Sequence, residues 1–171
     1  MTKIIAFSGV HNTGKTAAIK AMKNLLLKQG KCVLVLEECT HLFVKYVNDD
    51  QRMMQSSINK MELCRMKYVQ ELKDQEIFDY ILIDRTPKDN VGYTKYFQQT
   101  GKLDPDFLVM DTDECPYDLI IFYTTPVFQI FQEKAKMLEK ILLETLSEYP
   151  TKIIQLKNFK QNKEETLEIV K

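Results

Sequence analysis

The sequence predicts an α/β protein in which a parallel five-stranded sheet carries helices on both faces. Three observations lead to this prediction: short apolar runs of strand length, longer stretches with apolar residues at helical spacing, and the alternation of the two along the chain. Strands that alternate with helices pair in parallel, because each helix returns the chain to the start of the next strand. The length suits a single domain that spans residues 1–171.

The first strand is predicted at Lys3–Ser8, and a loop from Gly9 to Gly14 joins it to a helix from Lys15 to Gln29. Apolar residues recur in this helix every three to four positions, and Gly30 stands where a C-terminal cap is expected. The remaining elements are predicted, in chain order, as a strand at 32–36, a helix at about 52–74, a strand at 80–83, a helix from Pro87 to about 99, a strand at 118–123, a helix from Pro126 to about 149, a strand at 152–156 and a helix at 163–170.

Composition excludes several classes of function. The 24 basic and 24 acidic side chains balance, which gives no electrostatic case for a nucleic-acid or membrane-surface partner. Cys32, Cys39, Cys64 and Cys115 form no C-x-x-C pair, so the spacing indicates neither a disulfide framework nor a zinc site. No apolar run approaches the ~18 residues of a membrane-spanning helix. We therefore expect a soluble cytoplasmic protein with reduced thiols.

The loop after the first strand carries the most specific motif. Residues 9–16 read Gly-Val-His-Asn-Thr-Gly-Lys-Thr, which matches the phosphate-binding P-loop pattern G-x-x-x-x-G-K-[ST] between a strand and a helix. Its backbone N–H groups and the following helix N-terminus favour phosphate. Lys15 is predicted to reach the β- and γ-phosphates, and Thr16 to give its hydroxyl to Mg²⁺. The predicted nucleotide-binding residues are Gly9, Val10, His11, Asn12, Thr13, Gly14, Lys15, Thr16 and Ala17.

Three features near the nucleotide leave alternatives. His11 is either a catalytic base or a partly solvated mid-loop residue, and Asn158, after the fifth strand, is either a base-side contact or a surface-loop residue. The base itself is a purine, and ATP is favoured over GTP. The reason is that Tyr123-Thr-Thr-Pro126 stands at the end of the fourth strand, where a guanine-selecting N-K-x-D signature would be expected.

The carboxyl ends of the second and third strands carry the candidate catalytic residues, because ligands of parallel sheets bind beyond these ends. Asp84 directly follows a buried strand and is predicted to hold a magnesium-bound water opposite Thr16. Arg85 offers a planar fork to anionic groups. Glu37 or Glu38 could accept a proton from a substrate hydroxyl. Helix capping is the alternative role for all four residues.

Three segments resemble the small P-loop kinases that carry a ribosylnicotinamide-kinase-like AAA-type domain, relatives of thymidylate and deoxynucleoside kinases. They are FSGVHNTGKT at 7–16, VLEECTH at 35–41 and ILIDRTPKDNVGY at 81–93. The resemblance implies a three-layer αβα P-loop NTPase fold with strand order 2-3-1-4-5, and a site for ATP and Mg²⁺.

The resemblance also implies roles for four residues outside the loop. Glu38 corresponds to the general base, Arg85 to a substrate or phosphate contact, and Asp89 and Tyr93 to walls of the acceptor pocket. The sequence departs from the pattern at Asn12, where the family often has glycine.

A second departure concerns the lid. Such kinases usually bring arginines over the phosphates after the fourth strand, whereas no arginine follows Arg85 here. Lys134 and Lys136 are the replacements in a reduced lid near 126–140, unless they belong to a solvated helix face. Segment 101–117 has weak periodicity and several acidic residues, and we expect it to form a lid or excursion over the site.

Two functions follow. The leading hypothesis is a kinase that moves the γ-phosphoryl of ATP to a small acceptor such as a nucleoside or nucleotide, with Lys15, Glu38, Asp84 and Arg85 as catalytic residues. The acceptor pocket would be formed by Glu38, Arg85, Asp89 and Tyr93. The alternative, favoured by the missing lid arginine, is a nucleotide-dependent regulatory ATPase that acts through a protein partner. The sequence leaves open whether the protein forms a homodimer.

Overall fold

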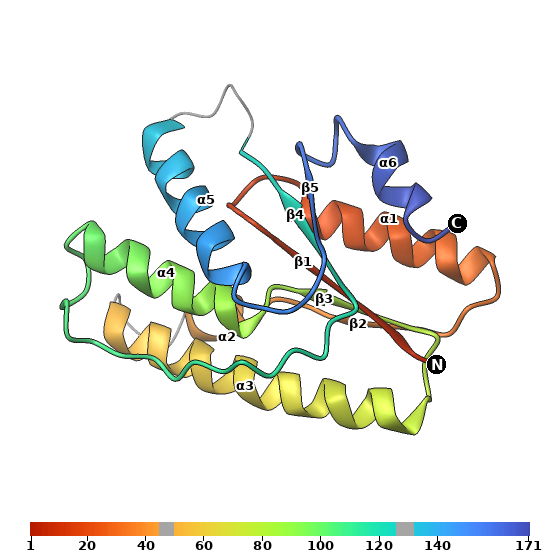
Figure 1. The fold of residues 1–171 in the computed structure, drawn as a ribbon, viewed down its shortest axis with the longest axis horizontal. Coiled ribbons are helices and arrows are strands. Elements are labelled where there is room, and N and C mark those ends of the chain that lie inside the picture. The colour runs from red at the N-terminus through yellow and green to blue at the C-terminus, as the bar shows by residue number, and fades with distance from the viewer. Residues whose placement is uncertain (45–49, 126–131) are drawn as a thin grey trace.

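The computed structural model describes residues 1–44, 50–125 and 132–171. A five-stranded sheet with the strand order β2-β3-β1-β4-β5 lies at the centre (Figure 1), and each of its four strand pairs is parallel. The predicted fold class and strand order are therefore confirmed. The strands are β1 (Lys3–Gly9), β2 (Val33–Leu36), β3 (Tyr80–Asp84), β4 (Leu119–Tyr123) and β5 (Ile153–Leu156).

Helices cover both faces of the sheet and make the three layers (Figure 1). Helices α1 and α6 pack on one face, and α3, α4 and α5 pack on the other. The helices in the described part of the chain are α1 (Lys15–Lys28), α2 (Thr40–Val44), α3 (Gln51–Gln75), α4 (Pro87–Gln99), α5 (Gln132–Leu146) and α6 (Lys163–Glu168).

Strand β1 joins the two halves of the core because its side chains alternate between the faces. Ile4 and Ala6 enter the cluster under α3, α4 and α5, whereas Ile5 and Phe7 enter the cluster under α1. All four side chains are almost completely buried. A strand buried on both faces reads as a continuous apolar run, which is why the pattern at Lys3–Ser8 was informative.

The helices differ from the sequence prediction in three places. Helix α2 was not expected, because a five-residue helix is too short to show a periodic pattern. The start expected for α5, at Pro126, lies outside the described residues, and the helix ends at Leu146 instead of continuing to Tyr149. Helix α6 ends at Glu168, two residues before Val170.

Segment 101–117 runs alongside α3 before it enters β4 (Figure 1). Asn59 of α3 exchanges two hydrogen bonds with the backbone of Met110, and Lys73 donates to the Pro116 carbonyl. Lys88 of α4 forms ion pairs with Asp111 and with Glu148, at 3.0 and 2.5 Å. The segment is thus held against the helices, and its role as a lid stays a prediction.

The register places the strand ends that carry the candidate residues beside one another. Phe7 of β1 pairs with Asp84 of β3, and Gly9 pairs with Tyr123 of β4. The loop after β1 and the residues after β3 therefore leave the sheet at the same edge, on neighbouring strands. In the described part of the chain, no helix has the length and apolar character needed to cross a bilayer.

Candidate active site

Three residues of the loop after β1 have positive φ angles, a backbone conformation that favours glycine or asparagine. Gly9 has a φ of 126°, and a Cβ there would lie 2.3 Å from the Tyr123 carbonyl oxygen. Gly14 has a φ of 93°, and a Cβ there would lie 2.9 Å from Cβ of Phe159. Asn12 has a φ of 63°. Asparagine tolerates this left-handed conformation better than most residues, which explains how it stands where relatives often have glycine.

Lys15 lies at the centre of the loop. Its Nζ donates to the carbonyl oxygens of Gly9 and Val10, each at 3.0 Å, and the residue is 7 % exposed. Burial, helped by the nearby Arg85 guanidinium, lowers the pKa of Lys15 to about 8. Among the described residues, the hydrogen bonds of this buried ammonium go to neutral carbonyls, so it gains much from an anionic partner and the position suits a phosphate group.

Thr16 and Asp84 form an oxygen-rich pair at the start of α1. The Thr16 hydroxyl donates to Oδ2 of Asp84 at 3.3 Å, whereas Oδ1 of Asp84 is buried with no hydrogen-bond partner among the described residues. Burial raises the pKa of Asp84, and Lys15 opposes this rise. A hydroxyl beside an unsatisfied carboxylate oxygen fits Mg²⁺, which prefers oxygen ligands. Bound there, Mg²⁺ would neutralise charge on the phosphates.

Arg85 connects the loop with the other strand ends. The residue has a φ of 71°, an uncommon conformation for a side chain of this size. Its Nε lies 2.8 Å from Oε1 of Glu38, its Nη1 lies 3.8 Å from Oδ1 of Asp89, and its guanidinium lies 4.8 Å from the centre of the Tyr93 ring. Nη2 approaches Nδ1 of His11 at 3.4 Å. The side chain is 6 % exposed, so these contacts fix its position.

His11 carries no charge at neutral pH in this environment. Burial, followed by the charges of Arg85 and Lys15, lowers the pKa of His11 to about 4. Burial acts to lower the pKa of Arg85, but Tyr93, Glu38 and Asp89 outweigh it and raise the pKa, so Arg85 keeps its charge.

Glu38 presents one carboxylate oxygen to the protein. Its Oε1 meets Arg85 and accepts a hydrogen bond of 2.7 Å from the Thr40 hydroxyl. For Oε2 the structure gives no partner among the described residues. Burial acts to raise the pKa of Glu38, but Arg85 and Thr40 outweigh it and lower the pKa. Glu38 is therefore ionised at neutral pH, with one oxygen available to a ligand.

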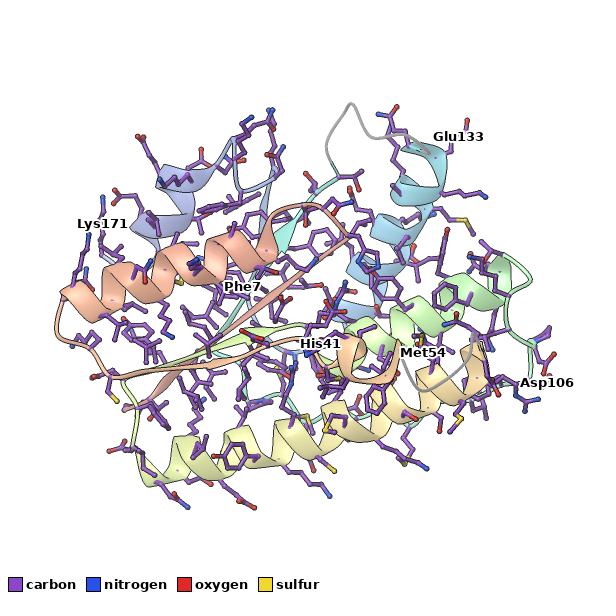
Figure 2. All side chains as sticks on the ribbon, turned by 180° about the vertical axis from the view of Figure 1, so that it is seen from behind. Phe7, His41, Met54, Asp106, Glu133 and Lys171 are labelled. Carbon is purple, nitrogen blue, oxygen red and sulfur yellow. The ribbon has the colours of Figure 1, made fainter. Side chains whose placement is uncertain are left out.

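A cavity of about 180 Å³ opens beside these residues. In Figure 2 the label Met54, on α3, marks one side of this cavity, and the label His41, on α2, marks the neighbouring groove. The cavity is lined by apolar side chains such as Ile58 and Phe97 together with polar and charged ones. Its lining comes from the loop (His11), the segment after β2 (Glu38 and Thr40), one face of α3 (Gln51, Met54, Gln55, Ile58 and Glu62), the segment after β3 (Arg85 and Thr86) and α4 (Asn90, Tyr93 and Phe97).

Two amide side chains in the cavity wall hold each other in place. Oε1 of Gln55 accepts hydrogen bonds from Nδ2 of Asn90 at 2.8 Å and from the Thr94 hydroxyl at 3.4 Å. Oδ1 of Asn90 is buried and has no partner among the described residues. The wall thus offers a fixed acceptor to a polar edge of a ligand.

The structure brings most of the predicted acceptor-side residues together. Glu38, Arg85 and Tyr93 line the cavity, as does His11. Asp89 does not line it, because its carboxylate caps α4 by accepting from Thr86 and also accepts a short hydrogen bond from Ser8.

The remaining candidates lie outside the cavity. The Asn158 side chain bonds to Gln161 within a surface turn, and the backbone of the next residue, Phe159, donates to the Thr13 carbonyl of the loop. Lys134 and Lys136 are exposed near the start of α5, which Glu133 marks in Figure 2.

Sequence reasoning missed the contribution of α3. Gln51, Gln55, Ile58, Glu62 and Arg65 recur at spacings of three or four residues and so share one face. Gln55 and Glu62 are only 3 % and 2 % exposed. Polar residues at core-facing helix positions were the available signal, because such groups are rarely buried without a partner.

Comparisons with known proteins agree with this architecture. No curated protein matches the chain. The fold is similar to that of deoxyadenosine kinase from M. mycoides with bound dATP, at a TM-score of 0.63 and 14 % identity, covering 98 % of this chain and 96 % of that chain. It is also similar to that of thymidylate kinase from Ehrlichia chaffeensis, at a TM-score of 0.63 and 13 % identity, covering 99 % of each chain.

These two structures share the three-layer fold that the P-loop segments implied. At such identities they establish the fold, whereas the sequence match establishes the family. Residues 4–161 match AAA_28, a family of AAA domains, and the chain therefore belongs to that family.

Proposed function

We propose that the protein transfers the γ-phosphoryl group of ATP to a hydroxyl group of a small uncharged acceptor, such as a nucleoside. One observation carries this proposal. Glu38 lines the cavity and also the neighbouring groove that contains Thr16 and Asp84. A single carboxylate thus stands between the place suited to phosphate and magnesium and the place suited to an acceptor.

The chemistry assigned to Glu38 is proton acceptance. As the acceptor oxygen bonds to the γ-phosphorus, the bond to the β-phosphate oxygen breaks and ADP leaves. The hydroxyl proton passes to Oε2 of Glu38, the oxygen that neither Arg85 nor Thr40 engages. Lys15 and Arg85 place positive charge near the transferring group.

Charges in the cavity favour an uncharged acceptor over a phosphate monoester. The acidic and basic lining residues are Glu38, Glu62 and Arg85, while His11 is neutral and burial raises the pKa of Tyr93, which stays protonated. Arg85 is already paired with Glu38 and with Asp89 behind it. A second phosphate would face two carboxylates and one shared guanidinium, so its desolvation would be poorly compensated.

The structural neighbours support the kinase class, since the two described above are a deoxyadenosine kinase and a thymidylate kinase. The absence of arginine after Arg85 instead favours the second candidate, a nucleotide-dependent regulatory ATPase that a protein partner completes. An arginine over the phosphates is worth about 10³–10⁵ in rate, so its loss would slow an isolated ATPase.

An acceptor panel tests the proposal. Purified protein with ATP and Mg²⁺ is assayed for ADP release with nucleosides, deoxynucleosides and the matching 5′-monophosphates. We expect turnover that requires a nucleoside and disappears in the Glu38→Gln variant. Turnover that requires a monophosphate would contradict the uncharged acceptor. ADP release that no acceptor stimulates would contradict the kinase and favour the regulatory ATPase.

A further inference from the structure

Arg65 lies on α3 and makes an unusual set of contacts at the carboxyl edge of the sheet. Its Nη1 donates a short hydrogen bond to the Glu37 carbonyl, and its Nη2 donates to the carbonyl oxygens of Asp84 at 2.7 Å and Arg85 at 3.0 Å. One guanidinium thereby joins the chain after β2 to the chain after β3. Its side chain is only 10 % exposed, which keeps water from competing for these bonds.

The three carbonyls belong to the backbone that carries the candidate catalytic groups. Glu37 immediately precedes Glu38, and Asp84 and Arg85 contribute their own side chains to the site. Arg85 needs support, because its left-handed backbone is less stable than the usual conformations for a residue with a side chain. Its N–H donates to the Phe7 carbonyl at 2.9 Å, and Arg65 holds its carbonyl from the other side.

Glu62 and Cys39 hold the Arg65 guanidinium in its orientation. Oε2 of Glu62, one turn earlier on α3, lies 2.8 Å from Nη2 of Arg65. Oε1 of Glu62 accepts a hydrogen bond of 3.1 Å from the Cys39 thiol. Burial, with the Glu62 carboxylate beside it, raises the pKa of Cys39 to about 12, so the thiol stays a donor. Both oxygens of Glu62 are thus engaged.

We propose that Arg65 is a positioning residue, which sets the distance between Glu38 and Arg85 by holding the strand ends that carry them. Its catalytic consequence rests on the proposed kinase function, but its structural consequence does not. Arginine is required because its planar fork reaches carbonyls on two strands at once, whereas the compact lysine ammonium does not.

The test compares Arg65→Lys with Arg52→Lys. Arg52 lies on the same helix but is 63 % exposed, with its ion pair to Asp104 at the surface, and so provides a matched control. With a nucleoside acceptor identified, we expect Arg65→Lys to lower kcat about 10²-fold, because misplacing reacting groups by about 1 Å has effects of that size. ATP affinity, measured by calorimetry, is expected to change less than about twofold.

The second readout is independent of turnover and uses the only two histidines in the chain. The His11 C2 proton is assigned by NMR with the aid of a His41→Asn variant. If Arg65→Lys lets Arg85 leave His11, the protonation midpoint of His11 rises above about 4 but stays below the ordinary value of about 6.5, because burial and Lys15 still lower it. Arg52→Lys leaves the midpoint unchanged. Glu62→Gln is expected to raise the His11 midpoint by a smaller amount, and it replaces Arg65→Lys in this test if that variant fails to fold.

The outcomes separate the two proposals. An inactive wild type whose His11 midpoint rises in Arg65→Lys would overturn the kinase and retain the positioning role of Arg65. An unchanged His11 midpoint in folded Arg65→Lys or Glu62→Gln would overturn the positioning role. A folded Arg65→Lys variant with normal kcat would also overturn the positioning role. A variant in which ATP affinity, kcat and melting temperature all fall would overturn it as well, because that pattern indicates general loss of structure.

Discussion

Nε of Arg85 lies 2.8 Å from Oε1 of Glu38, so the guanidinium after β3 and the carboxylate after β2 face each other across the edge of the sheet. In this pair the second oxygen of Glu38 has no partner among the described residues, and the Arg85 guanidinium lies 4.8 Å from the centre of the Tyr93 ring. The Arg85 side chain is 6 % exposed and that of Glu38 is 26 % exposed, so losing one partner leaves the other charge poorly compensated and is expected to change ligand binding as well.

Glu38→Gln tests the proton acceptor. The amide keeps the shape of the side chain but accepts no proton at neutral pH, so we expect kcat to fall about 10²–10⁴-fold with little change in KM for ATP. Steady-state kinetics with the best nucleoside measures both values. Glu37→Gln is the control, because Glu37 uses its backbone carbonyl toward Arg65. If Glu37→Gln lost activity and Glu38→Gln kept it, the assignment would be wrong by one residue.

Lys15 predicts a pH dependence of ATP binding. Its pKa of about 8 means that the free protein loses this charge as pH rises through 8, whereas a bound phosphate favours the ammonium. ATP binding therefore takes up a proton, and affinity falls above pH 8 with a limiting slope of about tenfold per pH unit. Calorimetry in two buffers of different ionisation enthalpy measures both effects.

The lowered pKa of Lys15 also affects the stability of the fold, which rises with pH where ATP affinity falls. Between about 8 and the ordinary value of 10.5 the unfolded chain holds the Lys15 proton and the folded protein does not, so the cost of burying this ammonium shrinks and stability rises with pH through that window. Lys15→Arg stays charged and is expected to remove the pH dependence of ATP affinity above pH 8. A wild-type affinity that stays flat from pH 7 to 9.5 would argue against a titrating Lys15.

Thr16 and Asp84 are expected to act on one magnesium ion. Thr16→Ala and Asp84→Asn each remove an oxygen ligand or its water contact, so each is expected to raise the Mg²⁺ concentration needed for half-maximal ATP binding. Because the two side chains also bond to each other, the double variant is expected to lose less than the sum of the two. Strict additivity would mean that the residues serve separate sites.

Gly92 predicts an effect on stability that is separate from the chemistry. A Cβ at this position of α4 would lie 2.8 Å from Cδ2 of Leu142 and 2.9 Å from Oγ1 of Thr145 on α5. We expect Gly92→Ala to destabilise the fold by about 1–3 kcal/mol through overpacking, partly offset by the better helix propensity of alanine. Thermal unfolding measures the change, with Lys95→Ala as the exposed control on α4. An unchanged or higher melting temperature would show that α5 moves away freely.

The sequence predicted the parts of the site that are local in the chain. Strand–loop–helix order and the two glycines are enough to define the phosphate loop, and Asp84 and Arg85 could be placed because they directly follow a buried strand. The contacts from α3 could not be predicted in this way. Arg65 is 20 positions from Arg85, whose carbonyl it holds, and the pairing depends on how α3 packs against the sheet.

Asp89 is a residue whose role the local sequence pattern does not decide. Resemblance suggested a pocket wall, but the residue type in a Thr-Pro-x-Asp stretch also suits a helix cap. In the structure the side chain makes that capping box and reaches Ser8 and Arg85, so it supports Arg85 from behind. Whether a buried carboxylate faces a ligand or a helix end depends on packing and not on the local pattern.

The lysines at the start of α5 separate the two candidate functions. Charge that develops on the transferring phosphoryl must be neutralised, and after Arg85 the chain offers lysine but no arginine for this purpose. Lys134 and Lys136 are exposed, so replacing either with alanine is expected to leave the melting temperature nearly unchanged.

In a self-sufficient kinase, Lys134→Ala or Lys136→Ala lowers kcat while ATP affinity stays nearly normal, because the contact strengthens in the transition state. In a regulatory ATPase both substitutions are silent, and basal hydrolysis stays slow until a protein partner is added. ADP release is measured for wild type and both variants, with and without nucleoside, and Lys140→Ala on the same helix is the exposed control. Brisk nucleoside-dependent turnover that neither substitution affects would reject the lysine lid and leave Arg85 as the main cationic group beside Lys15.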